Sequence, residues 1–436
     1  MIDLLFTNNM NIFWFRRDLR LDDNAGLYHA LKSGNPVQCV FIFDNEILDK
    51  LEDKKDRRVV FIHRQLSKLN QQLTELGSSL IVKHGKPIEA WKKLVNEFKI
   101  EQVFTNHDYE PYAKERDETI RSLLEKKDVH FHTYKDQVIF EKNEVTKDDG
   151  LPYTVFTPFM KKWRATIKPF YLKSYPTEKY FDAFVKSRPT QIISLKEIGF
   201  IDSEYEFPLP KVSKDILANY EQQRDIPSIR GTSRLSVHLR FGTISIRKLV
   251  RQAWANEKWV NELIWREFYM MILWQFPHVV DNAFKSTYNQ LPWLNNESHF
   301  QKWCEGNTGY PIVDAGMREL NSTGFMHNRV RMITSMFLTK YLLIDWRWGE
   351  AYFASKLIDF ELSSNNGGWQ WSAGTGVDAA PYFRLFSMSE QTKRFDPNFK
   401  YIRKWVPEFE DFSYPKPIVD YAMARKRCLD FYKQNL

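Results

Sequence analysis

The residues Ser364-Asn-Asn-Gly-Gly-Trp-Gln-Trp371 place two tryptophans beside two asparagines, two glycines and a glutamine. Apolar cores use Leu, Ile and Val instead. Glycines let another group approach the backbone closely, and side-chain amides can hydrogen-bond the edge of a planar polar molecule. The stretch therefore indicates contact with a flat polar ligand. The alternative is an ordinary turn, because Asn-Gly is a common turn dipeptide.

Five further motifs accompany this stretch along the chain. They are Trp14-Phe-Arg-Arg-Asp-Leu-Arg20, Asn261-Glu-Leu-Ile-Trp-Arg-Glu-Phe-Tyr269, Gly309-Tyr-Pro-Ile-Val-Asp-Ala-Gly-Met-Arg318, Gly324-Phe-Met-His-Asn-Arg-Val-Arg-Met332 and Asp345-Trp346. Through them the chain resembles the photolyase/cryptochrome family, and most closely its class I cyclobutane pyrimidine dimer photolyases. The resemblance runs from about Asn11 to about Trp405.

Length and composition indicate a large globular enzyme. The 436 residues exceed the size at which one core stops growing, so two domains are expected. Hydrophobic residues make up 43% of the chain, and no apolar run approaches the roughly 18 residues that cross a bilayer. Residues 1–10 lack the features of a secretory signal, which favours the cytoplasm. The cysteines at 39, 304 and 428 lie far apart and predict reduced thiols, with neither a disulfide nor a metal site.

Charge and aromatic content bear on the partner. The net charge of +8 is compatible with a polyanion such as DNA, although many basic proteins bind none. Ten of the fourteen tryptophans fall between Trp254 and Trp371, more than core packing usually requires.

The first part of the chain alternates apolar runs with helical patterns, which predicts a parallel, doubly wound α/β domain. The expected strands are 12–15, 37–43, 80–82, 103–105 and 129–133, and the expected helices are 26–32, 57–76, 87–98 and 113–126. Ligands of such sheets bind beyond the carboxyl ends of the strands, which places Arg16, Arg17, Asp44 and residues 106–110 near any site there. No GxGxxG or Walker pattern supports an NAD-binding or P-loop domain.

The rest of the chain has a different pattern. Residues 136–211 are charged and contain prolines, and we expect a connector there. Residues 212–436 have helical spacing almost throughout, which predicts a larger all-α domain after the α/β domain of residues 10–135. By the resemblance, this helical domain binds flavin adenine dinucleotide (FAD) and DNA.

The segment Gly231-Thr-Ser-Arg-Leu-Ser236 combines a glycine, three hydroxyls and an arginine before a helical segment. Hydroxyls and backbone amides at a helix start suit a phosphate, although a capped helix with a satisfied arginine is the alternative. In photolyases the matching segment holds the FAD diphosphate. The resemblance therefore assigns cofactor binding to Tyr220, Thr232, Ser233, Arg234, Leu235, Ser236 and Trp259.

Glu262, Trp265, Arg266 and Tyr269 stand at i, i+3, i+4 and i+7, which puts a carboxylate, an indole, a guanidinium and a phenol on one helix face. This combination indicates a polar pocket with stacking walls, which suits a flipped base pair. Photolyases take their target out of the duplex.

The resemblance implies that Trp265 stacks on the dimer and that Glu262 hydrogen-bonds a pyrimidine carbonyl, which a protonated carboxyl in a desolvated pocket can do. Arg329 has the alternative of a solvated helix charge. The other substrate contacts that the resemblance assigns are Arg224, at the DNA backbone, and Asn328, Arg329, Met332 and Trp371.

Three positions match groups beside the flavin ring. Asn365 matches the residue that faces the flavin N5 atom, where many cryptochromes have Asp or Cys, so Asn favours repair. Asp359 and Arg331 match a buried ion pair beside the ring, and such pairing offsets the cost of burial. The chain departs from a frequent family pattern because Phe360-Glu361 follows Asp359 where Gly-Asp is common. This departure affects the predicted cofactor contacts of Phe360 and Glu361.

Trp369, Trp346 and Trp293 match the family's electron relay to photoexcited oxidised flavin. For any one of them alone a core role is the better interpretation, whereas the matched set of three favours the relay. The segment from His327 to Met332 distinguishes photolyases that repair cyclobutane dimers from those that repair (6-4) photoproducts. Photolyases of the (6-4) type carry a histidine pair there, whereas this chain has only His327.

The resemblance thus implies a deoxyribodipyrimidine photo-lyase: reduced FAD passes an electron to a flipped-out cyclobutane dimer in UV-damaged DNA and recovers it after the ring opens. We expect a monomer. The identity of a second, light-harvesting chromophore is left open: it could be a methenyl folate contacted by Glu110, a deazaflavin or another flavin, or the site could be empty. The lysine expected in the facing segment 276–284 is missing, and Lys285 follows it.

Two other classes of function compete. A cryptochrome-like blue-light photoreceptor would share the flavin and the relay, but a long signalling tail is not expected because the chain ends at Leu436. A light-independent nucleic-acid binder would explain the charge and the aromatics but not the flavin motifs.

Overall fold

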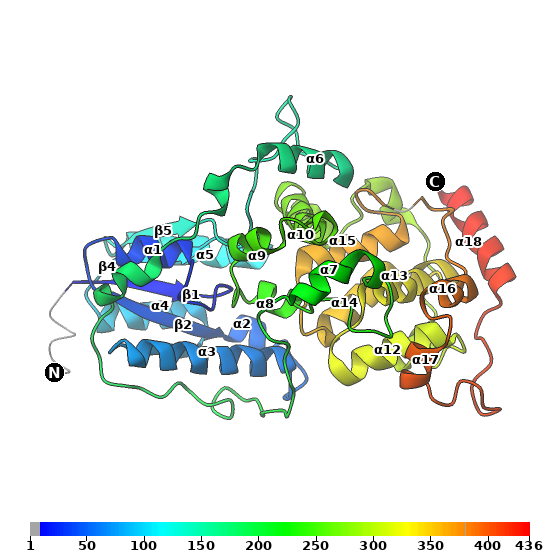
Figure 1. Ribbon diagram of the computed structural model, residues 1–436, viewed down its shortest axis with the longest axis horizontal. Coiled ribbons are helices and arrows are strands. Elements are labelled where there is room, and N and C mark those ends of the chain that lie inside the picture. The colour runs from blue at the N-terminus through cyan, green and yellow to red at the C-terminus, as the bar shows by residue number, and fades with distance from the viewer. Residues whose placement is uncertain (1–8, 380) are drawn as a thin grey trace. The chain divides into compact units, whose positions relative to one another are not determined.

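The computed structural model describes residues 9–379 and 381–436. Residues 1–10, on which the absence of a secretory signal was predicted, lie mostly outside this range. The chain divides into two compact units, each built from three segments (Figure 1). Unit 1 comprises Met1–Glu141, Ile167–Lys211 and Leu235–Ala255, and unit 2 comprises Lys142–Thr166, Val212–Arg234 and Asn256–Leu436.

These segments differ from the boundaries that the sequence suggested. Residues 136–211, predicted as one connector, are shared between the two units. Residues 142–166 belong to unit 2 and contain helix α6 (Phe156–Thr166). Residues 235–255, predicted as part of the helical domain, belong to unit 1. The chain therefore passes between the units repeatedly.

Unit 1 contains one parallel sheet of five strands in the order β3-β2-β1-β4-β5. The predicted parallel α/β architecture is confirmed, and each expected strand is present. The observed strands are β1 (Met10–Phe15), β2 (Val37–Asp44), β3 (Leu80–Gly85), β4 (Ile100–Asn106) and β5 (His130–Tyr134). The order reverses between β1 and β4, which is the position where ligands of such sheets bind.

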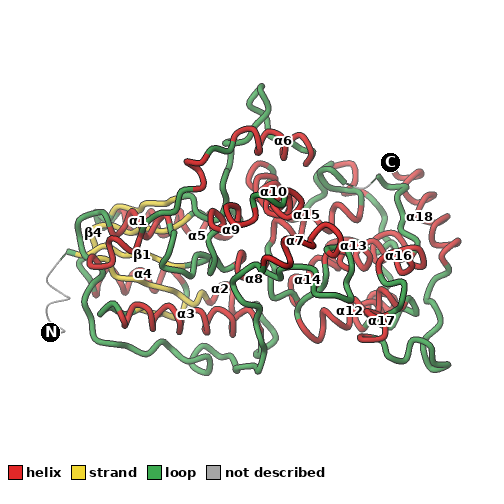
Figure 2. The backbone as a smooth tube through the Cα atoms, in the orientation of Figure 1, coloured by secondary structure: helices red, strands yellow, loops and turns green. Residues whose placement is uncertain are grey.

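Helices cover both faces of this sheet, as Figure 2 shows. Alternate residues of β1 point to opposite faces: Phe13 and Phe15 join a core with α1 and α3, whereas Ile12 and Trp14 join a core with α4 and α5. The helices are α1 (Ala25–Leu31), α2 (Asn45–Leu48), α3 (Arg57–Glu75), α4 (Pro87–Glu97) and α5 (Pro111–Glu125). Proline at the first position of α4 and of α5 fits their starts, because that residue needs no N–H donor.

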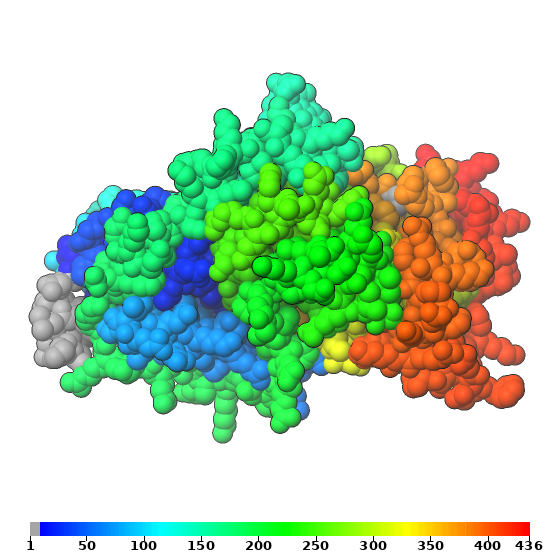
Figure 3. All heavy atoms as spheres, viewed as in Figure 1, coloured from blue at the N-terminus to red at the C-terminus, as the bar shows by residue number. Residues whose placement is uncertain are grey.

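The second segment of unit 1 packs against α3. Phe184, Leu195, Ile198 and Phe200 are buried in the core that α3 forms with the sheet. Figure 3 shows this green segment bordering the light-blue surface of α3. The segment includes the 3-10 helices η1 (Pro169–Leu172) and η2 (Thr177–Ala183).

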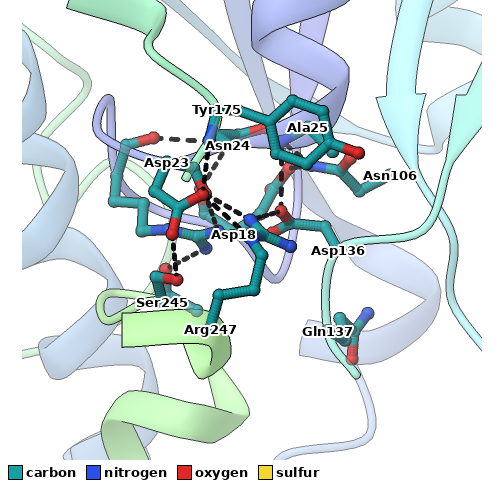
Figure 4. Close-up of polar contacts among 12 residues, drawn as sticks. Asp18, Asp23, Asn24, Ala25, Asn106, Asp136, Gln137, Tyr175, Ser245 and Arg247 are labelled. Atoms are coloured by element: carbon teal, nitrogen blue, oxygen red, sulfur yellow. Dashed lines mark hydrogen bonds and ion pairs between the residues drawn. The ribbon is translucent and has the colours of Figure 1, made fainter. Parts of the chain in front are cut away.

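A buried ion-pair network joins the third segment of unit 1 to the first (Figure 4). The Arg247 guanidinium donates to Asp23 and to Asp136, each at 2.8 Å, and Ser245 Oγ donates to Asp23 at 2.5 Å. Arg20 donates to the other Asp136 oxygen at 2.7 Å. Burial raises the pKa of Asp136, but the guanidiniums of Arg20 and Arg247 outweigh it and hold that pKa below its ordinary value. Helix α9 (Ile246–Ala253), which follows α8 (Ser236–Arg240), is thereby fixed to the loops that carry Asp23 and Asp136.

The regular elements among the described residues of unit 2 are all helices, and the predicted all-α domain is confirmed. Its helices after α6 are α7 (Lys214–Gln223), α10 (Glu257–Gln275), η3 (Pro277–Val280), η4 (Ser286–Gln290), α11 (Glu297–Glu305), α12 (Pro311–Thr323), α13 (Asn328–Met336), η5 (Phe337–Tyr341), α14 (Trp346–Lys356), α15 (Leu362–Ala373), α16 (Met388–Phe395), α17 (Lys400–Trp405) and α18 (Tyr421–Asn435).

The stretch from Ser364 to Trp371 is neither a turn nor a loop but most of helix α15. The helix requires glycine at position 367, because a Cβ atom there would lie 2.2 Å from the ring of Tyr269 on α10. The glycine therefore allows α10 and α15 to approach closely, and the turn alternative is wrong.

Candidate functional site

Helix α10 carries the predicted pocket residues. It begins after Asn256, whose side-chain oxygen accepts a hydrogen bond from the Trp259 backbone N–H at 2.8 Å. Glu262, Trp265 and Tyr269 are half-buried on this helix, whereas Trp259 is buried. The predicted face thus remains partly accessible at its carboxylate, indole and phenol.

Two ion pairs gather at the accessible end of this face. Arg224 Nη1 donates to Glu262 Oε1 at 2.6 Å, and Arg329 Nη2 donates to Asp225 Oδ1 at 2.9 Å. Burial raises the pKa of Glu262, and the neighbouring Arg224 opposes the rise. Asp225 was not predicted, because nothing in its local sequence distinguishes it from a surface carboxylate.

Arg329 is not a solvated helix charge. Its side chain is only 18% exposed, its guanidinium lies 4.4 Å from the ring centroid of Phe395, and it contacts the Met332 sulfur at 3.6 Å. Asn328 is exposed at the first position of α13. The structure thus brings Arg329 and Met332 together, as predicted, beside the Asp225 carboxylate.

The predicted pair of Arg331 and Asp359 is present. Arg331 Nη2 donates to the two Asp359 oxygens at 2.9 and 3.1 Å, and Arg331 Nε donates to the Met326 carbonyl at 2.8 Å. Arg266 and Glu361 form a second buried pair, with 3.3 Å between Nε and Oε2. Arg266 therefore faces the protein interior, although the sequence placed it on the pocket face.

Asn365 and Gly368 share one face of α15, since they stand at i and i+3. Asn365 is buried and its amide nitrogen donates to the Glu350 carbonyl at 3.1 Å, which directs the amide oxygen elsewhere. A Cβ atom at Gly368 would meet no atom within 4 Å. Open space beside a buried amide fits the edge of a planar ring such as that of a flavin.

The three relay tryptophans differ in depth. Trp369 and Trp346 are buried in one core, and Trp293 packs against that core while remaining half-buried. Trp369 lies edge-on to Phe353, at 4.9 Å between centroids. The Arg347 guanidinium lies 4.7 Å from the ring centroid of Trp346. Trp293 is thus the most exposed of the three, and their role as a relay stays a prediction.

The loop from Gly231 to Ser236 is closely packed at its start. A Cβ atom at Gly231 would lie 2.6 Å from the Gln223 carbonyl oxygen, and Arg234 adopts a left-handed conformation (φ 52°) with its guanidinium 4.3 Å from the centroid of Phe325. Within the described chain, no hydrogen bond is made by the hydroxyls of Thr232, Ser233 and Ser236. The boundary between the units falls after Arg234, so Leu235 and Ser236 belong to unit 1. Tyr220, on α7, is buried.

The end of the sheet where a second chromophore was considered carries ion pairs. Glu110 accepts from Arg17 at 3.2 Å and from Arg240, and Arg17 also donates to Asp108 at 3.0 Å. The Arg17 and Arg240 guanidiniums outweigh the effect of burial and hold the pKa of Asp108 well below its usual range. The residues that line the narrow hollow here are Arg16, Arg17, Asp18, Asn106, Asp108 and Gln137.

No helix in residues 9–379 and 381–436 is both long and apolar enough to span a bilayer. Over the same residues, no group of three or more His, Cys, Asp and Glu side chains is arranged to hold a metal ion.

Comparison with known proteins gives full-length matches. Residues 259–413 match the FAD binding domain of DNA photolyase, and residues 11–179 match the DNA photolyase domain. A deoxyribodipyrimidine photo-lyase of Synechococcus sp. is 36% identical, with 97% of this chain and 96% of the relative covered.

Two solved structures share the fold. A photolyase of Sulfolobus tokodaii, described with two FAD molecules, has a TM-score of 0.81 at 34% identity and covers 98% of this chain and 100% of its own. A cryptochrome of Synechocystis sp. has a TM-score of 0.84 at 24% identity, with 97% and 99% covered, and this likeness concerns the fold alone.

Proposed function

The chain belongs to the photolyase/cryptochrome family, and from this premise we propose that it repairs cyclobutane pyrimidine dimers in UV-damaged DNA with the energy of light. The observation that carries the proposal is that unit 2 holds both the lesion-pocket pairs around Glu262 and Arg329 and the flavin-type residues Asn365 and Asp359. The function is that of a deoxyribodipyrimidine photo-lyase.

The flavin residues of this chain fit FAD. When bound in its reduced form and excited by blue or near-ultraviolet light, FAD supplies one electron to a dimer and takes it back after the ring opens. The amide oxygen of Asn365 can accept a hydrogen bond from an N–H group of the flavin ring, and Gly368 leaves space beside it. The Arg331–Asp359 pair is the ion pair proposed to lie beside the ring.

The phosphates of FAD would be held by the hydroxyl-rich loop. Its hydroxyls are without partners in the described chain, so they remain available as donors to phosphate oxygens. The residues proposed for this role are Tyr220, Thr232, Ser233, Arg234, Leu235, Ser236 and Trp259, with Phe360 and Glu361 near the ring.

The lesion pocket would bind the dimer by stacking and by charge. Trp265 offers an indole face, and Glu262 offers a carboxyl whose raised pKa favours the protonated form that can donate to a pyrimidine carbonyl. That hydrogen bond stabilises negative charge as it appears on the dimer. Arg224, Tyr269, Asn328, Arg329, Met332 and Trp371 complete the proposed contacts, whereas Arg266, paired with Glu361, supports the pocket from inside.

Reactivation of oxidised flavin would use the tryptophans. Trp369, Trp346 and Trp293 would pass a hole from the buried core to the half-buried surface. The net charge of +8 supports binding to the DNA backbone, which should weaken with salt. We further propose that the enzyme acts as a cytoplasmic monomer. The buried, unpaired cysteines at 39, 304 and 428 support a reducing compartment.

The experiment is blue-light conversion of an oligonucleotide that carries one thymine dimer, with the reduced protein, a dark control and chromatographic separation of products. Light-dependent recovery of intact thymines is expected. Bound, photoreducible flavin without recovery would overturn dimer repair and favour a photoreceptor. A protein that retains no flavin would overturn the proposal altogether.

A further inference from the structure

Phe156 lies flat against Trp265, the indole proposed to stack on the dimer. The two ring centroids are 3.6 Å apart and the rings are within 5° of parallel. Phe156 is 7% exposed, whereas Trp265 is half-buried. One face of the indole is therefore covered by protein, and a planar lesion can stack only on the other face.

We propose that Phe156 is a positioning residue for lesion recognition: it holds the Trp265 ring in the orientation that accepts a pyrimidine dimer. This inference rests on the proposed function and extends it to helix α6, whose residues the sequence did not connect with the site. Phe156 acts through Trp265 and does not itself touch the dimer.

The position of Phe156 is fixed by its neighbours. Its backbone N–H donates to the Asp378 carboxylate at 3.0 Å, and Asp378 lies in the loop that follows α15. Two side chains of helix α6 donate hydrogen bonds to α10. Trp163 Nε1 donates to Glu267 at 2.5 Å, and Arg164 Nη2 donates to Asn261 at 2.9 Å.

Tyr269 gives Trp265 a second connection to α15. Tyr269 lies 5.5 Å from Trp265 with 30° between the rings, and its ring contacts α15 at Gly367. The contacts thus run from α15 through Asp378 to Phe156, across Trp265 and Tyr269, and back to α15. Trp265 is therefore connected to α15, the helix that carries Asn365, by two routes: one through Phe156 and Asp378, the other through Tyr269.

A stacked aromatic pair restricts the indole before the lesion arrives. Without it, Trp265 could rotate about its side-chain bonds, and binding the dimer would then cost the entropy of fixing the ring. Stacked pairs contribute enough free energy that their loss should weaken dimer binding about three- to tenfold. Flavin binding and photoreduction do not involve this ring and should not change.

The test compares Phe156→Leu with Phe159→Leu. Phe159 lies on the same helix, is 2% exposed and packs on Phe268 at 5.3 Å, so its variant removes an equal amount of buried aromatic surface without touching Trp265. Binding to dimer-containing and undamaged oligonucleotides, turnover in light and flavin photoreduction are measured for both, with Phe156→Tyr as the conservative variant.

Phe156→Leu should raise the dimer Kd about three- to tenfold over Phe159→Leu, leave binding to undamaged DNA unchanged, and be rescued by Phe156→Tyr. Equal dimer binding by the two leucine variants, or an equal loss on undamaged DNA, would overturn the inference while the proposed function stands. Failure of the unchanged protein to bind the dimer would overturn both.

Discussion

Arg224 Nη1 lies 2.6 Å from Glu262 Oε1, so the carboxylate proposed to hydrogen-bond the lesion is engaged by a guanidinium before DNA arrives. The pair is only partly buried, with side-chain exposures of 29% and 37%, and it can therefore exchange for a ligand. Arg224 is also the residue proposed to contact the DNA backbone. The two residues are expected to separate on binding.

Replacing Glu262 with Ala should reduce repair of a dimer oligonucleotide about ten- to hundredfold, the loss typical of a hydrogen bond to a charged group. Flavin photoreduction should persist, since it does not use this carboxyl. Quantum yield of repair and the rate of flavin photoreduction, measured on one preparation, separate the two effects. Parallel loss of both would contradict the assignment.

The pH dependence of repair should follow the same carboxyl. Because the pKa of Glu262 is raised, it keeps its proton to higher pH than an ordinary glutamate, and repair should decline as pH rises through that pKa. Glu262→Gln cannot ionise, so its repair rate, although lower, should lose this alkaline decline. An unchanged pH profile in the Gln variant would assign the titration to another group.

Gly367 and Gly368 form a matched pair of adjacent substitutions. Gly367→Ala should destabilise the protein by about 1–3 kcal/mol, because its Cβ would collide with the Tyr269 ring. Gly368→Ala meets no atom and should be neutral or stabilising by up to about 1 kcal/mol, since Ala favours the helix. Urea unfolding measures both.

Flavin content then tests the open face of α15. If the ring lies against Gly368, Gly368→Ala should fold normally yet retain less flavin after purification. Full flavin content in that variant would place the ring elsewhere.

Asp359→Asn should leave Arg331 without its carboxylate and lower the free energy of unfolding by about 1.5–3 kcal/mol. Flavin content should fall with it. Glu390→Gln, which alters a pair exposed on α16, is the control and should change neither quantity. Normal flavin retention by Asp359→Asn would separate this pair from the cofactor.

Arg247→Met should destabilise unit 1 by about 3–5 kcal/mol, because it leaves the buried Asp23 and Asp136 partly uncompensated. The pKa of folded Asp136 lies below the unfolded value of about 3.9. Its pairs therefore stabilise the fold fully above that pH and lose their effect as pH falls through the folded-state pKa. The difference between Arg247→Met and the unchanged protein, from denaturant unfolding, should be constant near neutrality and shrink in acid. A difference independent of pH would point to lost packing alone.

The parallel sheet was predictable because its strands are short apolar runs between amphipathic helices. The observed ends of the strands and helices differ from the predicted ends by a few residues. Helix α15 was not predictable from Asn-Asn-Gly-Gly, which locally favours a turn, because the reason for Gly367 lies on α10, at Tyr269. The tertiary contact overrides the local preference.

The site was predictable where a residue type carries the chemistry. Glu262, Trp265 and the pair of Arg331 and Asp359 belong to this class. Asp225 and Phe156 were not, because an aspartate and a phenylalanine are ordinary residues until the fold places them beside Arg329 and Trp265. Arg266 was placed on the pocket face by helical spacing alone, and its partner Glu361 draws it inward.

The three-segment construction of unit 1 has a consequence for biosynthesis. Asp23 and Asp136 both pair with Arg247, which lies more than a hundred residues after strand β5. The sheet therefore emerges from the ribosome long before the residue that completes its polar network. Nascent chains shorter than about 255 residues should thus remain open to chaperones and proteases. A gene truncated at the end of the first segment, after Glu141, would encode a sheet in which Asp136 keeps its pair with Arg20 but Asp23 lacks the Arg247 guanidinium.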